Sequence, residues 1–120
     1  MIPYQEEHRI FRRTLQAFLQ KEILPFVDAW EKDGIVPRSA WKKMGEHGFL
    51  CPDVPEAYGG AGADFLYTVI VVEEMTRTNH CGLSARLHSS VVVPYITAYA
   101  TEEQKRHYLP RCVSGDCITA

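Results

Sequence analysis

The chain has 120 residues, of which 46% are hydrophobic and 11% aromatic, so its length fits one domain with a sizeable core. A formal net charge of -2 and a pI near 6.2 provide no basic surface for nucleic acid. An apolar run such as residues 69–72 is far too short to span a bilayer, and the polar N-terminus lacks the apolar core of a signal peptide.

The first predicted element is a long helix from about Gln5 to Lys32. Its apolar residues recur at three- and four-residue steps and form one stripe: Phe11, Leu15, Phe18, Leu19, Ile23, Phe26, Val27 and Trp30. Pro25 removes one backbone hydrogen bond and should bend the helix, while the stripe continues in phase beyond it. Asp33 and Gly34 supply a C-terminal stop.

A shorter second helix should begin at Pro37, because proline suits the first turn, and should end at Gly48. Trp41 and Met44 would form its buried face. The stretch 49–63 is predicted as loop, because it contains several residues that break regular structure: Pro52, Pro55, Gly59, Gly60 and Gly62.

The third helix should run from an Asp64 N-cap to about Thr78. The β-branched run 68–72 would also suit a strand. The length of the segment, its cap and the Glu73-Glu74-Met75 that follows favour a helix. A helix that is apolar nearly all round is expected to lie at the centre of a fold.

A connection at 79–82 should lead into a fourth helix that reaches about Tyr99. Four residues recur at four-residue steps along it: Leu83, Leu87, Val91 and Tyr95. Pro94 should bend or break it. With the helix that follows, these elements predict an all-α fold of about five main helices.

The last helix has a clear start and end. Thr101 can act as its N-cap, and Gln104 three residues later completes a capping box. The helix should span 102–113, and Ser114-Gly115-Asp116 is typical of a turn. Cys117, Ile118 and Thr119 suit the beginning of a strand at the C-terminus.

These motifs, in this order, resemble the N-terminal domain of the acyl-CoA dehydrogenases. The resemblance covers nearly the whole chain and is carried by the 101–105 capped helix, Leu109-Pro110, the 114–116 turn, Pro55 to Gly60 with Gly62, Glu73-Glu74, and the segment 88–99. Residues 30–34 and 87–97 are most similar to the long-chain branch. Ala100 stands where the family usually has glycine. The resemblance implies a helical domain over 1–116 and the start of a middle β domain at 117–120.

Two sequence patterns could indicate ligand sites, but simpler explanations account for both patterns better. The Gly59-Gly60-Ala61-Gly62 cluster lacks the Lys-Ser or Lys-Thr and the preceding strand of a phosphate loop. The four cysteines, Cys51, Cys81, Cys112 and Cys117, form no Cys-x-x-Cys pair with which His107 could complete a zinc site. Buried thiols in a reducing compartment are favoured, so no metal-binding residue is assigned.

Glu73 and Glu74 are adjacent, so on a helix they point about a third of a turn apart. They cannot flank one substrate atom as an acid/base pair does. Solvation, or pairing with Arg77, is the favoured role.

His88-Ser89-Ser90 interrupts an otherwise apolar helix. From composition alone, the hydroxyls would bond to the preceding helical turn and His88 would face solvent. The resemblance implies instead that this helix lines the slot for a fatty acyl chain. The substrate-binding positions would then be Ser84, Ala85, His88, Ser89 and Val92, which share one helix face. Small side chains there would leave room for the chain, and His88 would mark a polar limit to its depth.

The resemblance also implies what the complete protein does. It would be an FAD-dependent flavoprotein that removes hydrogens from the α and β carbons of a fatty acyl-CoA. A carboxylate takes the α proton and the flavin accepts the β hydride. Both groups are expected outside this chain, so no catalytic or cofactor-binding residue is assigned here. The chain would form one wall of the acyl pocket and be inactive alone.

The resemblance further implies an electron-transferring flavoprotein as electron acceptor, and a homo-oligomer, dimer or tetramer, with no membrane span. The expected location is the bacterial cytoplasm, or the mitochondrial matrix in a eukaryote. A different class remains open, namely a stand-alone helical scaffold or interaction domain without activity. Such a domain would cover its own apolar faces.

Overall fold

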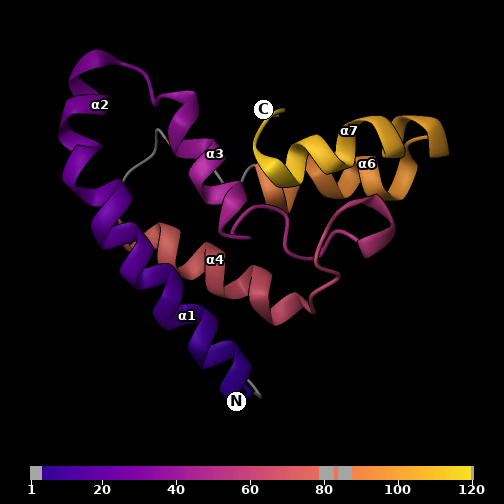
Figure 1. The fold of residues 1–120 in the computed structure, drawn as a ribbon, viewed down its shortest axis with the longest axis horizontal. Coiled ribbons are helices and arrows are strands. Elements are labelled where there is room, and N and C mark those ends of the chain that lie inside the picture. The colour runs from indigo at the N-terminus through magenta and orange to yellow at the C-terminus, as the bar shows by residue number, and fades with distance from the viewer. Residues whose placement is uncertain (1–3, 79–82, 84–87, 120) are drawn as a thin grey trace.

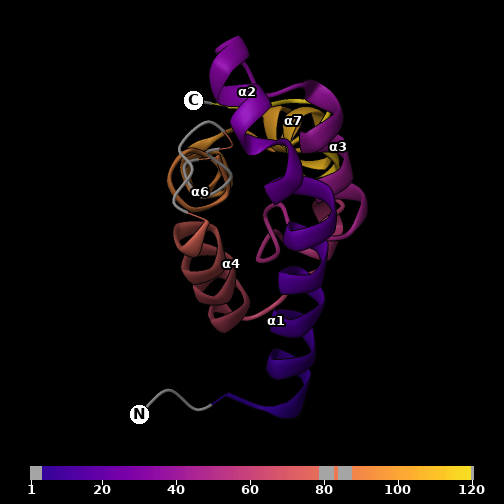
Figure 2. The ribbon, with the colours of Figure 1, turned by 90° about the vertical axis from the view of Figure 1, so that its left-hand side faces the viewer.

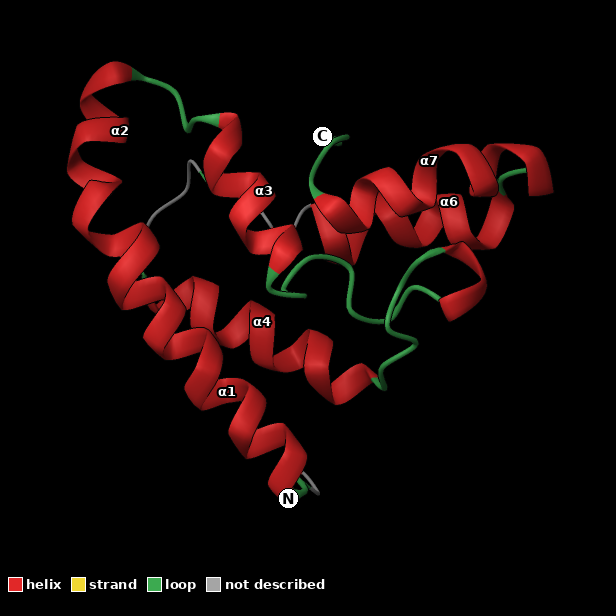
Figure 3. Cartoon of the chain, in the orientation of Figure 1, coloured by secondary structure: helices red, strands yellow, loops and turns green. Residues whose placement is uncertain are grey.

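A computed structural model describes residues 4–78, 83 and 88–119. The regular elements among these residues are all helical, and Figure 3 shows no strand among them. The bent α1–α2 helix, α3, α4, the η4–α6 segment and α7 are the five main helices that the pattern predicts. The arrangement measures 40 × 36 × 21 Å (Figures 1 and 2).

The predicted long helix is present and is bent at Pro25. α1 (Glu6–Phe18) widens into a π turn, η1 (Leu19–Ile23), then tightens into a 3₁₀ turn, η2 (Leu24–Phe26), and continues as α2 (Val27–Asp33). Proline cannot donate to the helical ladder, and the change of pitch accommodates its ring. Gly34 ends α2 in the left-handed conformation, with φ of 75°, as predicted.

The shorter helices begin and end close to their predicted bounds. Pro37 caps α3 (Arg38–Glu46), and the loop after it contains one 3₁₀ turn, η3 (Glu56–Tyr58). Asp64 caps α4 (Phe65–Arg77) by accepting a 2.9 Å hydrogen bond from Leu66 N. This settles the choice between helix and strand for that segment.

The C-terminal part forms a pair of adjacent helices. η4 (His88–Val92) is a π turn that leads into α6 (Val93–Tyr99), and α7 (Glu102–Ser114) lies beside α6 (Figures 1 and 2). The predicted capping box is confirmed, with Thr101 N donating to Gln104 Oε1 at 2.9 Å. Ala100 is extended, with φ of -70°, so this position does not require glycine here.

The core joins all of these helices. α1 and α4 lie side by side, and Leu15, Met44, Phe49, Ile70 and Leu109 are completely or almost completely buried. Trp41 and Met44 form the buried face of α3, as predicted.

The expected strand does not form within the described residues, where 117–119 have no regular structure. A strand needs a neighbour with which to share its hydrogen bonds, and the described helices offer none. A β domain beginning at 117 therefore stays a prediction.

Candidate functional site

A largely apolar groove of about 430 Å³ lies between α4 and the η4–α6 segment. It is lined by Asp53, Phe65, Thr68, Val69, Val72, Glu73, Ser90 and Pro94. Four of these side chains are apolar and come from neighbouring turns of α4 or from the start of α6. We call this hollow the α4–α6 groove.

Exposed apolar side chains lie on the two elements that form the groove. Phe65 in its lining is 71% exposed, and Val91 and Tyr95 on the η4–α6 segment are 50% and 65% exposed. Large exposed apolar surfaces of this kind usually mark binding sites or interfaces. The expectation that α4 lies at the centre of the fold is therefore met only on the face that packs against α1.

Thr68 and Ser90 bring polar atoms to the groove. The hydroxyl oxygens of both are buried, and within the described residues neither has a hydrogen-bond partner. A buried polar group without a partner is uncommon in native proteins.

His88 is completely buried, so the interpretation that it faces solvent is wrong. Its Nδ1 lies 3.1 Å from Thr119 N and accepts that backbone N–H, which assigns the ring proton to Nε2. Nε2 then donates to the carbonyl of Cys112 at 2.9 Å. Burial lowers the pKa of His88, against the opposing effect of the Cys112 hydrogen bond. The side chain thus joins η4 to α7 and to the C-terminal segment.

Ser89 is also buried and accepts a 3.0 Å hydrogen bond from Cys51 N. That bond fixes a backbone position with φ of 48°, which is uncommon for a residue other than glycine. His88, Ser89 and the half-buried Val92 are not among the residues that line the α4–α6 groove. Ser84 and Ala85 lie outside the described residues. The substrate-binding role of all five stays a prediction.

The carboxylates of Glu73 and Glu74 share one arginine. Arg12 donates to Glu73 Oε1 and to Glu74 Oε1, each at 2.9 Å, while Tyr4 donates to Glu73 at 2.9 Å. The pairing of Glu74 with Arg77 is present at 3.6 Å, but the main partner lies on α1. Hydrogen bonds from Arg12 and Tyr4 lower the pKa of Glu73.

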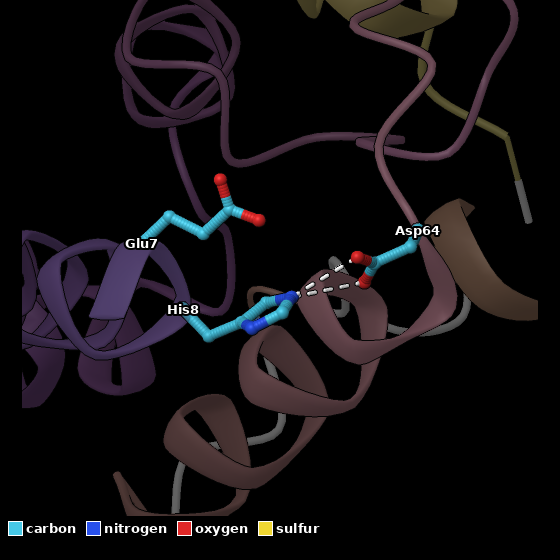
Figure 4. A group of neighbouring side chains, drawn as sticks. All are labelled: Glu7, His8 and Asp64. Atoms are coloured by element: carbon cyan, nitrogen blue, oxygen red, sulfur yellow. Dashed lines mark hydrogen bonds and ion pairs between the residues drawn. The ribbon is translucent and has the colours of Figure 1, made fainter. Parts of the chain in front are cut away.

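Glu7, His8 and Asp64 form a group with suitable ligand types for a metal ion (Figure 4). Hydrogen bonds already engage two of its three side chains, those of His8 and Asp64. His8 Nδ1 accepts from Gln5 N at 2.8 Å, so Nε2 carries the proton and donates to Asp64 at 3.1 Å. Both ring nitrogens are occupied, and Asp64 also caps α4.

The other chemical patterns are also explained by packing. Cys51 and Cys112 are buried thiols, and burial raises the pKa of each to about 12. His107 is exposed, and Cys81 lies outside the described residues. Gly60 packs directly against the backbone of Val54, where a side chain would collide. This close contact with the protein's own backbone is a sufficient reason for glycine at position 60.

Thr68, Phe65, Val69 and Val72 were not among the predicted site residues. The available signal is the apolar pattern of 64–78, which lacks a complete polar face and predicts central burial.

Among the described helices, none combines the length and hydropathy that crossing a membrane requires.

Comparison with known proteins identifies relatives over nearly the whole chain. Residues 5–116 match the family model described as the N-terminal domain of acyl-CoA dehydrogenase. The chain is 40% identical, over 117 residues, to the long-chain specific acyl-CoA dehydrogenase of mitochondria from Rattus norvegicus. That match covers 98% of this chain and 27% of the rat protein. The chain thus spans well under a third of that relative's length.

Solved structures show the same arrangement of helices. An acyl-CoA dehydrogenase from Geobacillus kaustophilus superimposes with a TM-score of 0.92 at 50% identity, covering 97% of this chain and 30% of that one. An acyl-CoA dehydrogenase from Bacillus anthracis, solved in complex with FAD, gives a TM-score of 0.86 at 27% identity and covers 98% of this chain and 20% of that one.

Proposed function

Since the chain belongs to the acyl-CoA dehydrogenase family, whose N-terminal domain it matches, we propose that it is part of a longer protein that oxidises fatty acyl-CoA thioesters. The reaction removes one hydrogen from the α carbon and one from the β carbon of the acyl chain. FAD, with which the Bacillus anthracis relative was solved, is the expected cofactor. Within this reaction, the 120-residue chain supplies one wall of the acyl pocket.

The observation that carries this proposal is the largely apolar α4–α6 groove, together with the exposed apolar side chains on the elements that form it. Four of its lining side chains are aliphatic or aromatic, which suits a hydrocarbon chain. Each methylene moved from water into such a surface contributes about 0.8 kcal/mol to binding. The groove also counts against a stand-alone scaffold, because such a protein would cover Phe65, Val91 and Tyr95 itself.

The glycine cluster gives no support for a flavin site in this chain, because Gly60 is packed against the protein's own backbone. Glu73 is also a poor candidate for the catalytic base. Glu73 is engaged by Arg12 and Tyr4, which lowers the pKa of its carboxyl and makes it a weaker proton acceptor. The flavin and the base are therefore assigned to other parts of the longer protein, and the chain alone is expected to be inactive.

The proposed electron acceptor is an electron-transferring flavoprotein, and the proposed assembly is a dimer or tetramer. Both rest on the family. The rat relative is mitochondrial and the Geobacillus kaustophilus relative is bacterial, so the two expected locations, the bacterial cytoplasm and the mitochondrial matrix, both stay predictions.

The test is to obstruct the groove in the complete flavoprotein. Val69→Trp places a large ring in the groove wall, whereas Ile35→Trp alters an exposed side chain in the α2–α3 connection. We expect Val69→Trp to lower kcat/KM for long-chain acyl-CoA by at least tenfold, on the order of the transfer energy of two methylenes, and to spare short-chain substrates. Ile35→Trp should change neither. An equal loss for all chain lengths, or no loss, would contradict the proposal.

A further inference from the structure

The hydroxyl of Thr68 behaves differently from those of the other helical threonines. Thr14, Thr76 and Thr97 each donate to the carbonyl four residues earlier, at 2.9, 2.7 and 3.2 Å. Thr68 makes no such bond, although the carbonyl of Asp64 occupies the equivalent place. The residue is only 5% exposed and its hydroxyl oxygen is buried, so bulk solvent does not reach it.

Ser90 presents the same situation from the opposite side of the groove. Its hydroxyl is buried and unpartnered among the described residues, while its neighbour Ser89 bonds Cys51 N. Two buried hydroxyls without partners, one on α4 and one on η4, thus line a single hollow. A side-chain hydroxyl both donates and accepts, and it can turn about its bonds to meet a ligand atom in the groove.

The charges at the groove restrict what that ligand atom can be. Asp53 and Glu73 contribute carboxylates to the lining, and among the described residues no positively charged side chain is part of it. Arg12 offsets part of the charge of Glu73, and the negative charge that remains would still disfavour a carboxylate at the end of an acyl chain. A neutral hydroxyl or carbonyl group would meet no such repulsion.

We infer that Thr68 and Ser90 form a hydrogen-bonding position within the acyl pocket, and that the substrates include acyl chains with a hydroxyl or carbonyl group partway along the chain. The inference rests on the proposed function, because it assigns the α4–α6 groove to the acyl chain. Thr68 and Ser90 then determine specificity without taking part in bond breaking.

The experiment uses the complete flavoprotein and a set of acyl-CoA thioesters of one chain length. One is unsubstituted, and the others carry a single hydroxyl moved along the chain carbon by carbon. The readout is the ratio of kcat/KM for each hydroxylated substrate to that for the unsubstituted one. In the wild type, one or two hydroxyl positions should give a higher ratio than their neighbours.

The variants are Thr68→Val, which keeps the shape of the side chain, and Ser90→Ala. Each should lower the ratio at the favoured position by about fivefold, the effect of one net hydrogen bond, whatever change it causes in kcat/KM for the unsubstituted chain. Thr76→Val is the control, because Thr76 lies on the same helix, is not part of the groove lining, and already donates its hydroxyl to Val72 O. If Thr68→Val does not fold, Ser90→Ala carries the same comparison.

A ratio that is flat along the chain, or one that both variants leave unchanged, overturns the inference even if the unsubstituted chain is oxidised normally. That result would indicate that water satisfies the two hydroxyls. A wild-type protein that oxidises no acyl-CoA at all would overturn the proposed function, and the inference with it.

Discussion

At the scale of single residues, Arg12 connects two helices through one guanidinium group. It bonds the half-exposed Glu73 and the buried Glu74, both on α4, from its place on α1. Arg12→Ala would leave Glu74 as a buried charge with weaker partners, Gln16 and Arg77. We expect a loss of about 3 kcal/mol in the free energy of unfolding, measured by urea denaturation.

The neighbouring Arg13 provides the matched control. It pairs at 3.4 Å with Glu6, and both side chains are largely exposed. Exposed ion pairs contribute little, so Arg13→Ala should change the free energy of unfolding by no more than about 0.5 kcal/mol. Equal losses for the two variants would show that the buried network has no special role.

His88 should make the stability of the chain depend on pH. Burial lowers its pKa in the folded state below the ordinary value of 6.5. As pH falls below that value, the unfolded chain binds a proton before the folded chain does, so stability decreases. The melting temperature should therefore fall between about pH 7.5 and pH 5.5.

The His88→Gln variant isolates this effect. It keeps a hydrogen-bonding side chain but removes the titrating group, so its melting temperature should be lower at pH 7.5 and should change less with pH. A slope identical to that of the wild type would assign the pH dependence to other residues.

Residue types and spacing predicted local contacts and missed distant ones. The Asp64 cap and the Thr101–Gln104 box involve atoms within three residues of each other, so the sequence alone indicated them. The bonds of Arg12 to Glu73, and of His88 to Thr119, span 61 and 31 residues. No helical period encodes such pairs, because they depend on how helices pack in space.

At the scale of elements, α3 and α7 approach each other so closely that their contact requires Gly45. A Cβ at this position would collide with the carbonyl of Ser114. Alanine in place of glycine within a helix normally stabilises by up to about 1 kcal/mol. Here the sign should reverse, and Gly45→Ala should destabilise the chain by about 2 kcal/mol in urea denaturation.

Gly34→Ala is the comparison for this prediction. A Cβ at Gly34 would meet nothing, so only its φ of 75° opposes the change. The expected cost is about 1 kcal/mol, from left-handed backbone strain alone. A stabilising effect of Gly45→Ala would show that α3 and α7 are farther apart than described.

At this scale, the sequence predicted where helices form and bend, but it did not predict the π turns within them. Pro25 predicted a bend in the first helix, and the helix bends there. The π turns over Leu19–Ile23 and His88–Val92 had no separate signal, because widening by one residue depends on packing against neighbouring helices. How the helices pack against one another also determines that one face of α4 lines a groove.

At the scale of the whole molecule, the chain exposes an apolar surface that a longer protein would cover. Phe65, Tyr95 and Tyr99 are all more than half exposed. The isolated chain should therefore self-associate, and sedimentation should show a mass that rises with concentration. Tyr95→Lys should weaken this association more than Ile35→Lys. A wild-type chain that stays monomeric at high concentration would count against the surface being an interface.

The central claim is that α4 and the η4–α6 segment line the acyl pocket. A long-chain acyl-CoA with a photoreactive diazirine at the end of its chain tests it directly in the complete flavoprotein. After illumination, labelled peptides should map to 65–77 or 88–99, and unmodified acyl-CoA should compete for them. Labelling confined to other parts of the protein, with neither segment modified, would contradict the account.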